Sequence, residues 1–244
     1  MKFGQDSVNS FGNNTRQDIW NGKFQSNGNI LWLNHYGSSS TDEGKGIAVK
    51  ANGDFFNTGY FGDNAVFGND TFNVNIGIDN AFIASFNASG KLDWLTQFKG
   101  GGDGRDLSIF KDRFIYGTGR YSKNNLIIGK DTLLPKGAND IFITKLKQDG
   151  TPVYAFGTGS LRADQANGIA VDGKGNSYIT GDYRKTTQFG SFNLSSKGGK
   201  DIFITKLFDI RLFQDTIPDT TLCAGQSLQV PFTVEGDFNP GNTF

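Results

Sequence analysis

The sequence predicts an all-β protein built from repeated four-stranded antiparallel units. Glycine supplies 34 of the 244 residues, roughly twice its usual share, and aromatic residues supply 14%. Short runs rich in β-branched and aromatic residues alternate with clusters of Gly, Asn and Asp, and no stretch of ten residues follows the helical period. These patterns are typical of strands that are joined by many turns.

Three motifs recur in a fixed order with a period of about 61 residues. The first opens with an acidic or amide residue ahead of an aromatic-containing run, at Asp18, Asn80, Asp140 and Asp201. The second reaches a Thr-Gly pair, at Thr58, Thr118 and Thr180. The third begins at a glycine suited to a tight turn, at Gly28, Gly90 and Gly150. The shared order indicates that one structural unit is copied along the chain.

Four strands are expected in the second unit, over residues 46–50, 54–61, 80–86 and 91–98. They are named strands a, b, c and d. Asn52-Gly53 between strands a and b is a strong hairpin signal, and Gly90 closes the turn between strands c and d. We therefore expect consecutive strands to be antiparallel neighbours.

Copies of such a unit favour a β-propeller, whose blades stack face to face, over a solenoid, which is the alternative. The first unit shows only strands c and d, and the fourth only strands a to c. We therefore expect residues 1–213 to form a partial propeller of three to four blades that lacks its N-terminal part and is completed by other blades of a longer chain. Residues 214–244 have a different texture and are expected to be a linker and the truncated start of a β-sandwich module.

Two parts of the chain resemble known families. The segments GIAVDGKGNSYITGDY (168–183) and KDIFITKL (200–207), with their counterparts over about residues 17–208, resemble the bacterial SBBP-type β-propeller repeat family. Asp112-Arg113 departs from the usual Asn-Gly turn. The segment after residue 218, with CAG at 223–225, resembles the start of immunoglobulin-like modules in large bacterial surface proteins. There Cys223 would have a partner beyond the chain, or else be a buried free thiol.

These resemblances imply a secreted or cell-surface bacterial protein, although residues 1–20 lack the pattern of a secretion signal. Lys+Arg and Asp+Glu balance at 24 each, so no basic field attracts nucleic acid, and no apolar run is long enough to enter a membrane. One histidine, His35, one cysteine and two glutamates leave few catalytic combinations. We expect a non-enzymatic binding or adhesion module without catalytic residues or cofactor; the alternatives are a passive spacer and a propeller enzyme, a lyase or hydrolase.

Several repeated residues have both a structural and a ligand-binding interpretation. The acidic or amide residues before strand c are expected to cap loop N–H groups, the alternative being a ring of metal ligands. Aromatic residues that recur in strands c and d, such as Trp32 and Trp94, are expected to pack between blades rather than to stack on sugars. Asp103 and Asp106 have calcium-like spacing, so calcium is an alternative ligand of this loop; because the closing Glu of an EF-hand is absent, no metal site is assigned.

Binding is expected on the face where the long b–c and d–a connections lie, because the other end has only tight turns. Asp42, Asp103 and Asp164 recur at equal spacing just ahead of strand a, so we expect them to ring the channel mouth. Possible partners are glycans and surface proteins. The candidate ligand-face residues are Asp42, Asp103, Arg105, Arg120, Tyr121, Arg162, Asp164, Tyr183 and Arg184.

Overall fold

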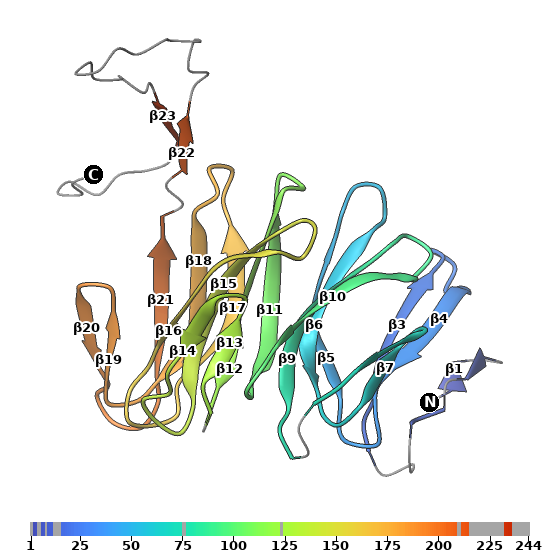
Figure 1. The fold of residues 1–244 in the computed structure, drawn as a ribbon, viewed down its shortest axis with the longest axis horizontal. Helices are drawn as coiled ribbons and strands as arrows, with labels where there is room; N and C mark the ends of the chain where they lie inside the picture. The colour runs from blue at the N-terminus through green and yellow to red at the C-terminus, as the bar shows by residue number, and fades with distance from the viewer. Residues whose placement is uncertain are drawn as a thin grey trace, which may run out of the picture.

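The computed structural model describes residues 2–3, 6–7, 9–11, 16–74, 77–122, 124–208, 211–214 and 232–235. In this part of the chain all regular structure is β, in agreement with the predicted fold class (Figure 1). No helix that could span a bilayer occurs among these residues. Cys223 and most of the segment 214–244, the predicted linker and immunoglobulin-like start, lie outside the described residues, which include only 214 and 232–235 of it.

Four units, blades 1 to 4, follow one another along the chain. Blade 1 contains β3 (Ile19–Phe24) and β4 (Ile30–Tyr36). Blade 2 contains β5 (Glu43–Val49), β6 (Phe55–Phe61), β9 (Asn80–Phe86) and β10 (Leu92–Phe98). Blade 3 contains β11 (Asp103–Phe110), β12 (Phe114–Tyr121), β15 (Asp140–Lys147) and β16 (Pro152–Thr158). Blade 4 contains β17 (Gln165–Val171), β18 (Ser177–Tyr183) and β21 (Asp201–Leu207). Every pairing within a blade is antiparallel between neighbours in the expected order.

The long b–c connections contain small hairpins that the sequence analysis did not anticipate. They are formed by β7 (Ala65–Phe67) with β8 (Asp70–Phe72), β13 (Leu126–Ile128) with β14 (Asp131–Leu133), and β19 (Thr186–Phe189) with β20 (Phe192–Ser195). Two further pairs are β1 (Lys2–Phe3) with β2 (Asp6–Ser7) and β22 (Arg211–Gln214) with β23 (Phe232–Glu235). The hairpin of each blade reaches the preceding blade, as Gly37 bridges to Val66 and Lys99 to Ile127.

Strand a is the innermost strand, and it begins before the predicted position because it contains a β-bulge. In blade 2 the register shifts between Gly44 and Gly46, so the strand begins at Glu43 rather than at residue 46. At the bulge the carbonyl oxygen of Glu43 approaches Gly59 so closely that a Cβ at this position would overlap it. The bulge therefore explains the repeated Thr-Gly pair, since only glycine fits beside it.

The inner strands of successive blades lie against one another. A Cβ on Gly46 of β5 would lie 2.9 Å from the Cα of Asp106 in β11, and the carboxylate of Asp106 accepts a hydrogen bond of 2.9 Å from the N–H of Ile169 in β17. Separate antiparallel sheets whose innermost strands lie side by side around one axis are the arrangement of a β-propeller.

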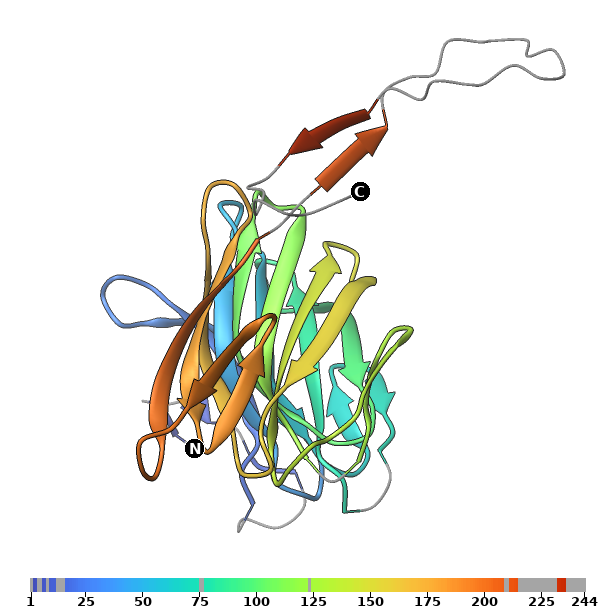
Figure 2. The ribbon, with the colours of Figure 1, turned by 90° about the vertical axis from the view of Figure 1, so that its left-hand side faces the viewer.

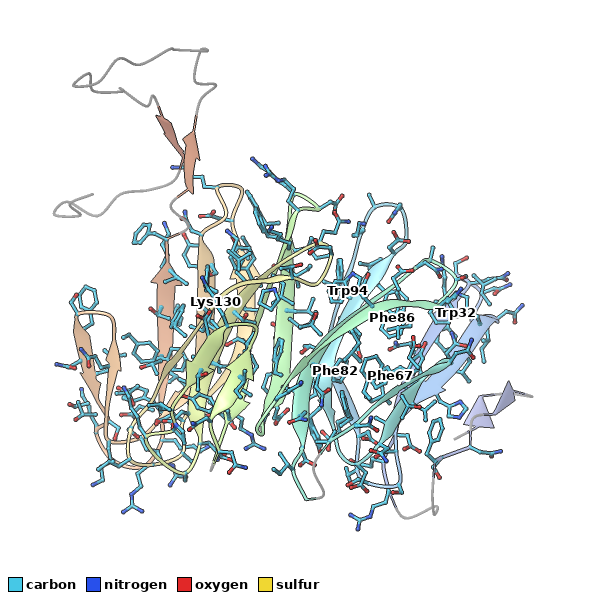
Figure 3. The ribbon with its side chains drawn as sticks, in the orientation of Figure 1. Trp32, Phe67, Phe82, Phe86, Trp94 and Lys130 are labelled. Atoms are coloured by element: carbon cyan, nitrogen blue, oxygen red, sulfur yellow. The ribbon has the colours of Figure 1, made fainter. Side chains whose placement is uncertain are left out.

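Aromatic side chains fill the spaces between the blades (Figure 3). Phe67, Phe82 and Phe86 have no exposed surface, and Trp32 stacks on Phe55. The indole N–H of Trp32 donates to the carbonyl of Ala88, in the c–d turn of the next blade, and that of Trp94 donates to Gln148 in the same way. The prediction that Trp32 and Trp94 pack between blades is confirmed.

Blade 4 presents positions that the interior blades bury. Ile141 and Ile143 in β15 of blade 3 are 0% and 2% exposed because they face blade 4. Their equivalents in β21, Ile202 and Ile204, are 82% and 74% exposed. Within the described residues, the outward face of blade 4 therefore remains apolar and open. The ribbon of blade 4 faces the viewer in Figure 2.

Candidate functional site at the loop-rich end of the inner strands

The loop-rich end of the blades lies at the bottom of Figure 1. Near the inner strands at this end, blades 2 to 4 each carry four equivalent residue positions. These are the first residue of strand a, the residue two further on, the strand b residue paired with the first, and the residue just before strand c. They are named the mouth residues: Glu43, Lys45, Tyr60 and Asp79 in blade 2; Asp103, Arg105, Arg120 and Asn139 in blade 3; Gln165, Asn167, Asp182 and Lys200 in blade 4.

Asp103 is the centre of this group, with three cations around it. Its carboxylate lies 2.9 Å from Lys45 Nζ, 2.9 Å from Arg105 Nε and 3.1 Å from Arg120 Nε. Lys45 comes from the preceding blade and the two arginines from Asp103's own blade. Because Asp103 is only 7% exposed, these partners compensate a charge that burial alone would disfavour.

The network extends from Asp103 into the blades on both sides. Toward blade 2, Lys45 Nζ lies 3.3 Å from Glu43, which also accepts a 3.0 Å hydrogen bond from the Tyr60 hydroxyl. Toward blade 4, the guanidinium groups of Arg105 and Arg120 donate to Gln165 Oε1 at 3.3 and 3.4 Å. Polar contacts therefore continue across three blades.

On blade 4 the same network ends at an ion pair. Gln165 Nε2 donates to Asp182 at 2.8 Å, and Lys200 Nζ lies 2.8 Å from the other carboxylate oxygen. Burial tends to raise the pKa of Asp182, but hydrogen bonds from Lys200, Gln165 and Asn167 outweigh it and lower this pKa. Asp182 is therefore held in its ionised form.

The groups in blade 2 respond to their surroundings in opposite directions. Burial favours a higher pKa for Glu43, but the hydrogen bond from Tyr60 and the charge of Lys45 outweigh it and lower the pKa. Burial, together with the charges of Asp103, Asp63 and Glu43, raises the pKa of Asp79. Blade 2 therefore combines a compensated carboxylate with an uncompensated one.

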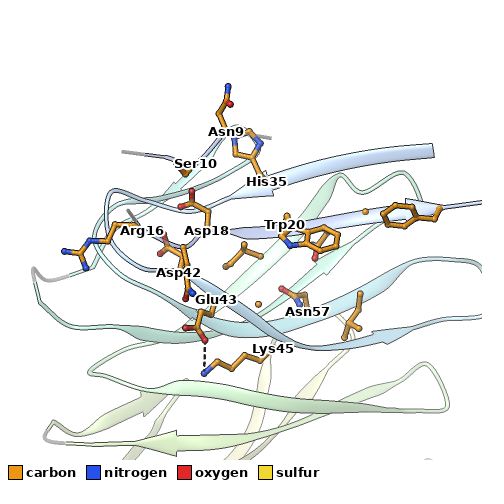
Figure 4. Close-up of a pocket in the computed structure, with 17 residues that line it drawn as sticks. Asn9, Ser10, Arg16, Asp18, Trp20, His35, Asp42, Glu43, Lys45 and Asn57 are labelled. Carbon is orange, nitrogen blue, oxygen red and sulfur yellow. Dashed lines mark ion pairs between the residues drawn. The ribbon is translucent and has the colours of Figure 1, made fainter. Parts of the chain in front are cut away.

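Two hollows lie beside the mouth residues. One of about 320 Å³ lies between blades 2 and 3 and is lined mainly by polar groups, among them Tyr60, Asp79, Arg120, Ser122 and Asn139. The other, of about 680 Å³, lies between blades 1 and 2 and is lined by residues that include Asp18, Trp20, His35 and Asn57 (Figure 4). The ion pair between Glu43 and Lys45 borders both hollows.

The structure does not place Asp42, Asp103 and Asp164 at one repeat position. Asp42 and Asp164 are 0% exposed and lie in connections 37–42 and 159–164, whereas the blade 3 connection, 99–102, is shorter and has Gly102 at the equivalent site. Asp103 is instead equivalent to Glu43 and Gln165. The expectation of a ring of three aspartates, which was based on their equal spacing, is therefore wrong. The units differ in length, so residues at equal separations in the sequence do not occupy equivalent positions in the blades.

Asp42 and Asp164 fasten two connections together. Asp42 accepts hydrogen bonds from the N–H groups of Ser38 at 2.6 Å and Gly62 at 3.0 Å. Asp164 accepts them from Ser160 at 2.6 Å and Arg184 at 2.7 Å. Burial raises the pKa of Asp42 to about 6, partly offset by these hydrogen bonds. Both carboxylates are therefore occupied by loop N–H groups and stabilise the loops, rather than being directed toward a ligand.

The other candidate residues divide into buried and exposed groups. Tyr121 and Tyr183, the last residues of strand b in blades 3 and 4, are 2% and 6% exposed and belong to the inter-blade cores. Burial, with the charge of Asp140, raises the pKa of Tyr121 to about 12. Arg162 and Arg184 are exposed on loops beside the mouth. Arg105 and Arg120 join the network around Asp103.

The prediction that the repeated residue at the start of strand c caps N–H groups of the preceding loop is confirmed for Asp18, Asp140 and Asp201. It is wrong for Asn80, which caps the loop after strand d instead. Asp18 accepts from the N–H of Phe11 at 2.7 Å, Asp140 from Lys136 at 2.6 Å, and Asp201 from Lys197 at 2.6 Å. In blade 2, Asn80 Oδ1 accepts from the N–H groups of Gly100 and Gly101. Among the described residues, no group of three or more His, Cys, Asp or Glu side chains could hold a metal ion.

Sequence reasoning did not select Lys45, Tyr60, Asp79, Asp182 or Lys200 as site residues. Their common signal is the β-bulge, which adds residues to the loop side of strand a and brings strand b and the residue before strand c beside them. The repeated Thr-Gly pair marks the bulge in each blade and could have located the first three positions.

The antiparallel units of up to four strands, whose inner strands pack against one another, define this chain as a β-propeller module. Comparison with protein families agrees, because residues 156–182 match the SBBP family model, described as a beta-propeller repeat. The matched segment runs from β16 into β18 and includes the bulge of blade 4. No curated protein matches the sequence at a significant level.

Proposed function

We propose that this chain is a non-enzymatic binding module of a secreted or cell-surface bacterial protein, and that the mouth residues contact glycans or other surface macromolecules. The supporting observation is that the residues that hold each blade together repeat from blade to blade, whereas the mouth residues do not. Thr58, Thr118 and Thr180 make the same hydrogen bond in each blade, to the carbonyl of an aromatic residue in strand c. The mouth residues share backbone positions but differ in chemistry from blade to blade.

Such a pattern suits recognition better than acid–base catalysis. A catalytic pair needs one group that can accept and one that can donate a proton at the working pH. Asp103 is surrounded by three cations, and Asp182 is held ionised by Lys200 and two amides. Fixed charges of both signs, presented at the end of a rigid scaffold, are instead suited to orienting a polar partner.

A glycan array probed with the labelled protein tests the proposal. We expect a defined subset of glycans to bind, and the Arg105→Ala variant to bind them about tenfold more weakly because it removes charged hydrogen-bond donors from the mouth. Lys130→Ala is the matched control. Lys130 is exposed beside Gly129, which contacts Pro152 at the tight-turn end of β16, and it is labelled in Figure 3.

Three results would contradict the proposal. If neither glycans nor envelope proteins bind, the passive spacer becomes the better description. If Lys130→Ala weakens binding as much as Arg105→Ala, the binding surface is not the mouth. If an array glycan is cleaved during the assay, the module is an enzyme.

A further inference from the structure

The smaller hollow, between blades 2 and 3, has the size and lining of a site for one small polar group. Its volume of about 320 Å³ lies at the lower end of the range for ligand sites. Five mouth residues with side-chain charges line it together with neutral polar side chains: Glu43, Lys45, Asp79, Asp103 and Arg120. A polar hollow with convergent hydrogen-bonding groups is better suited to a hydrophilic ligand than to an apolar one.

Asp79 is distinctive among the charged mouth residues. Glu43, Lys45, Asp103 and Arg120 each have an ion pair, and Asp182 pairs with Lys200. The carboxylate of Asp79, by contrast, makes no hydrogen bond or ion pair with any other described residue, and it is exposed at the hollow. It is therefore available to a cation that enters from solvent.

The charges near Asp79 select the sign of that ligand. Partial burial, together with the like charges of Asp103, Asp63 and Glu43, raises the pKa of Asp79. Lys45 is engaged by Glu43 and Asp103, and Arg120 by Asp103 and Gln165. The position equivalent to Asp79 is Asn139 in blade 3 and Lys200 in blade 4, so this excess of negative charge is particular to blade 2.

Neutral groups in the same hollow are suited to hydroxyl groups. The Tyr60 hydroxyl donates to Glu43, which leaves its oxygen able to accept. Ser122 and Asn139 add a hydroxyl and an amide, each both donor and acceptor. The ring face of Tyr60 lies under Lys45 Nζ, 5.0 Å away, so recognition here depends on hydrogen bonds rather than on stacking.

We propose that this hollow binds a sugar residue with a free, protonated amine, the ammonium pairing with Asp79 and the hydroxyl groups contacting Tyr60, Ser122 and Asn139. The inference rests on the proposed glycan-binding function and specifies its ligand class. A single unpaired carboxylate supplies the ammonium partner, and the neutral groups distinguish an amino sugar from a simple polyamine. An acetylated amine has no charge to offer and would leave Asp79 without a partner.

Calorimetric titration with two matched oligosaccharides tests this inference. The probes are a glucosamine tetramer with free amines and the corresponding fully N-acetylated tetramer. We expect the free amine to bind at least tenfold more tightly, since an ion pair with hydrogen bonds is lost on acetylation. Asp79→Asn should abolish that preference. Asp93→Asn, which removes an exposed carboxylate from β10 at the outer edge of blade 2, should keep it.

The outcomes separate this inference from the proposed function. Equal affinity for both tetramers, or an undiminished preference in Asp79→Asn, would overturn the amino-sugar site while array glycans that need Arg105 would still support a binding module. Tighter binding of spermidine or a lysine peptide than of the free tetramer would overturn the sugar class. Absence of any binding on the array and in calorimetry would overturn the amino-sugar site and the glycan-binding part of the proposed function. Unchanged melting of Asp79→Asn verifies that its fold is intact.

Discussion

Asp103 and Asp164 are the same residue type, are spaced by the average repeat length, and have nearly the same burial, yet their partners differ. Asp164 accepts hydrogen bonds from two backbone N–H groups and joins two loops. Asp103 has only side-chain cations around it, drawn from two blades. The comparison shows that the partners of a carboxylate, and not its place in a repeat count, distinguish a structural residue from one available to function.

The largest effect is expected at the structural aspartates. Asp164→Ala removes the acceptor for the N–H groups of Ser160 and Arg184 and leaves both without a protein partner. We expect the free energy of unfolding to fall by about 2–4 kcal/mol, which urea denaturation would measure. Asp93→Ala makes the same substitution at an exposed position and should alter the free energy of unfolding by less than about 0.5 kcal/mol. Equal losses in the two variants would contradict the structural role.

The second effect is a pH dependence that arises from Asp42. Burial raises its folded-state pKa to about 6 from the ordinary 3.8. The folded state then binds a proton that the unfolded chain releases, so the stabilisation from Asp42 is complete below pH 3.8 and declines as the pH rises through 6. We therefore expect the free energy of unfolding of the wild type, measured relative to that of Asp42→Asn, to fall by on the order of 2 kcal/mol between pH 4 and 7.

Urea denaturation of both proteins across this pH range measures the difference, and the titrations that the two proteins share cancel. A difference that is constant, or that increases with pH, would show that the hydrogen bonds from Ser38 and Gly62 dominate over burial.

The smallest effect is expected at Asp103. Asp103→Asn leaves Lys45, Arg105 and Arg120 facing one another, but these side chains are 21–36% exposed, so water screens much of the repulsion. We expect a loss of about 1 kcal/mol in unfolding free energy, increasing at low salt. A double-mutant cycle with Arg105→Gln should show coupling of about 0.5–1 kcal/mol. A loss as large as that in Asp164→Ala would remove the distinction between the two aspartates.

The sequence predicted the blades because local signals determine them. The glycines of the c–d turns, such as Gly90 at a φ of 81°, adopt a conformation that few other residues accept, and the Thr-Gly pairs mark a packing restriction. The β-bulges and the b–c hairpins were missed because they depend on contacts between strands and between blades. Tyr121 could not be placed from its loop-adjacent position, since only the packing of blade 3 shows that it is buried.

The sequence selected Asp103, Arg105 and Arg120, which the structure brings together in one network, but it did not select Asp79, which we propose as the partner of the ligand's amine. Asp79 precedes the repeated Asn80, so its own variability made it inconspicuous. Asp79 is a candidate because its carboxylate has no ion-pair partner among the described residues. Only the three-dimensional surroundings show this, and no sequence motif indicates it.

The bonds from Trp32 to Ala88 and from Trp94 to Gln148 place one indole at each of two successive blade boundaries. Indole emission depends on polarity and hydrogen bonding, so each ring is a built-in optical reporter for its own boundary. With Trp20 replaced, single-tryptophan proteins that retain either Trp32 or Trp94 would record whether neighbouring blades separate one at a time or together. Fluorescence can thus resolve the order in which the propeller comes apart without any added label.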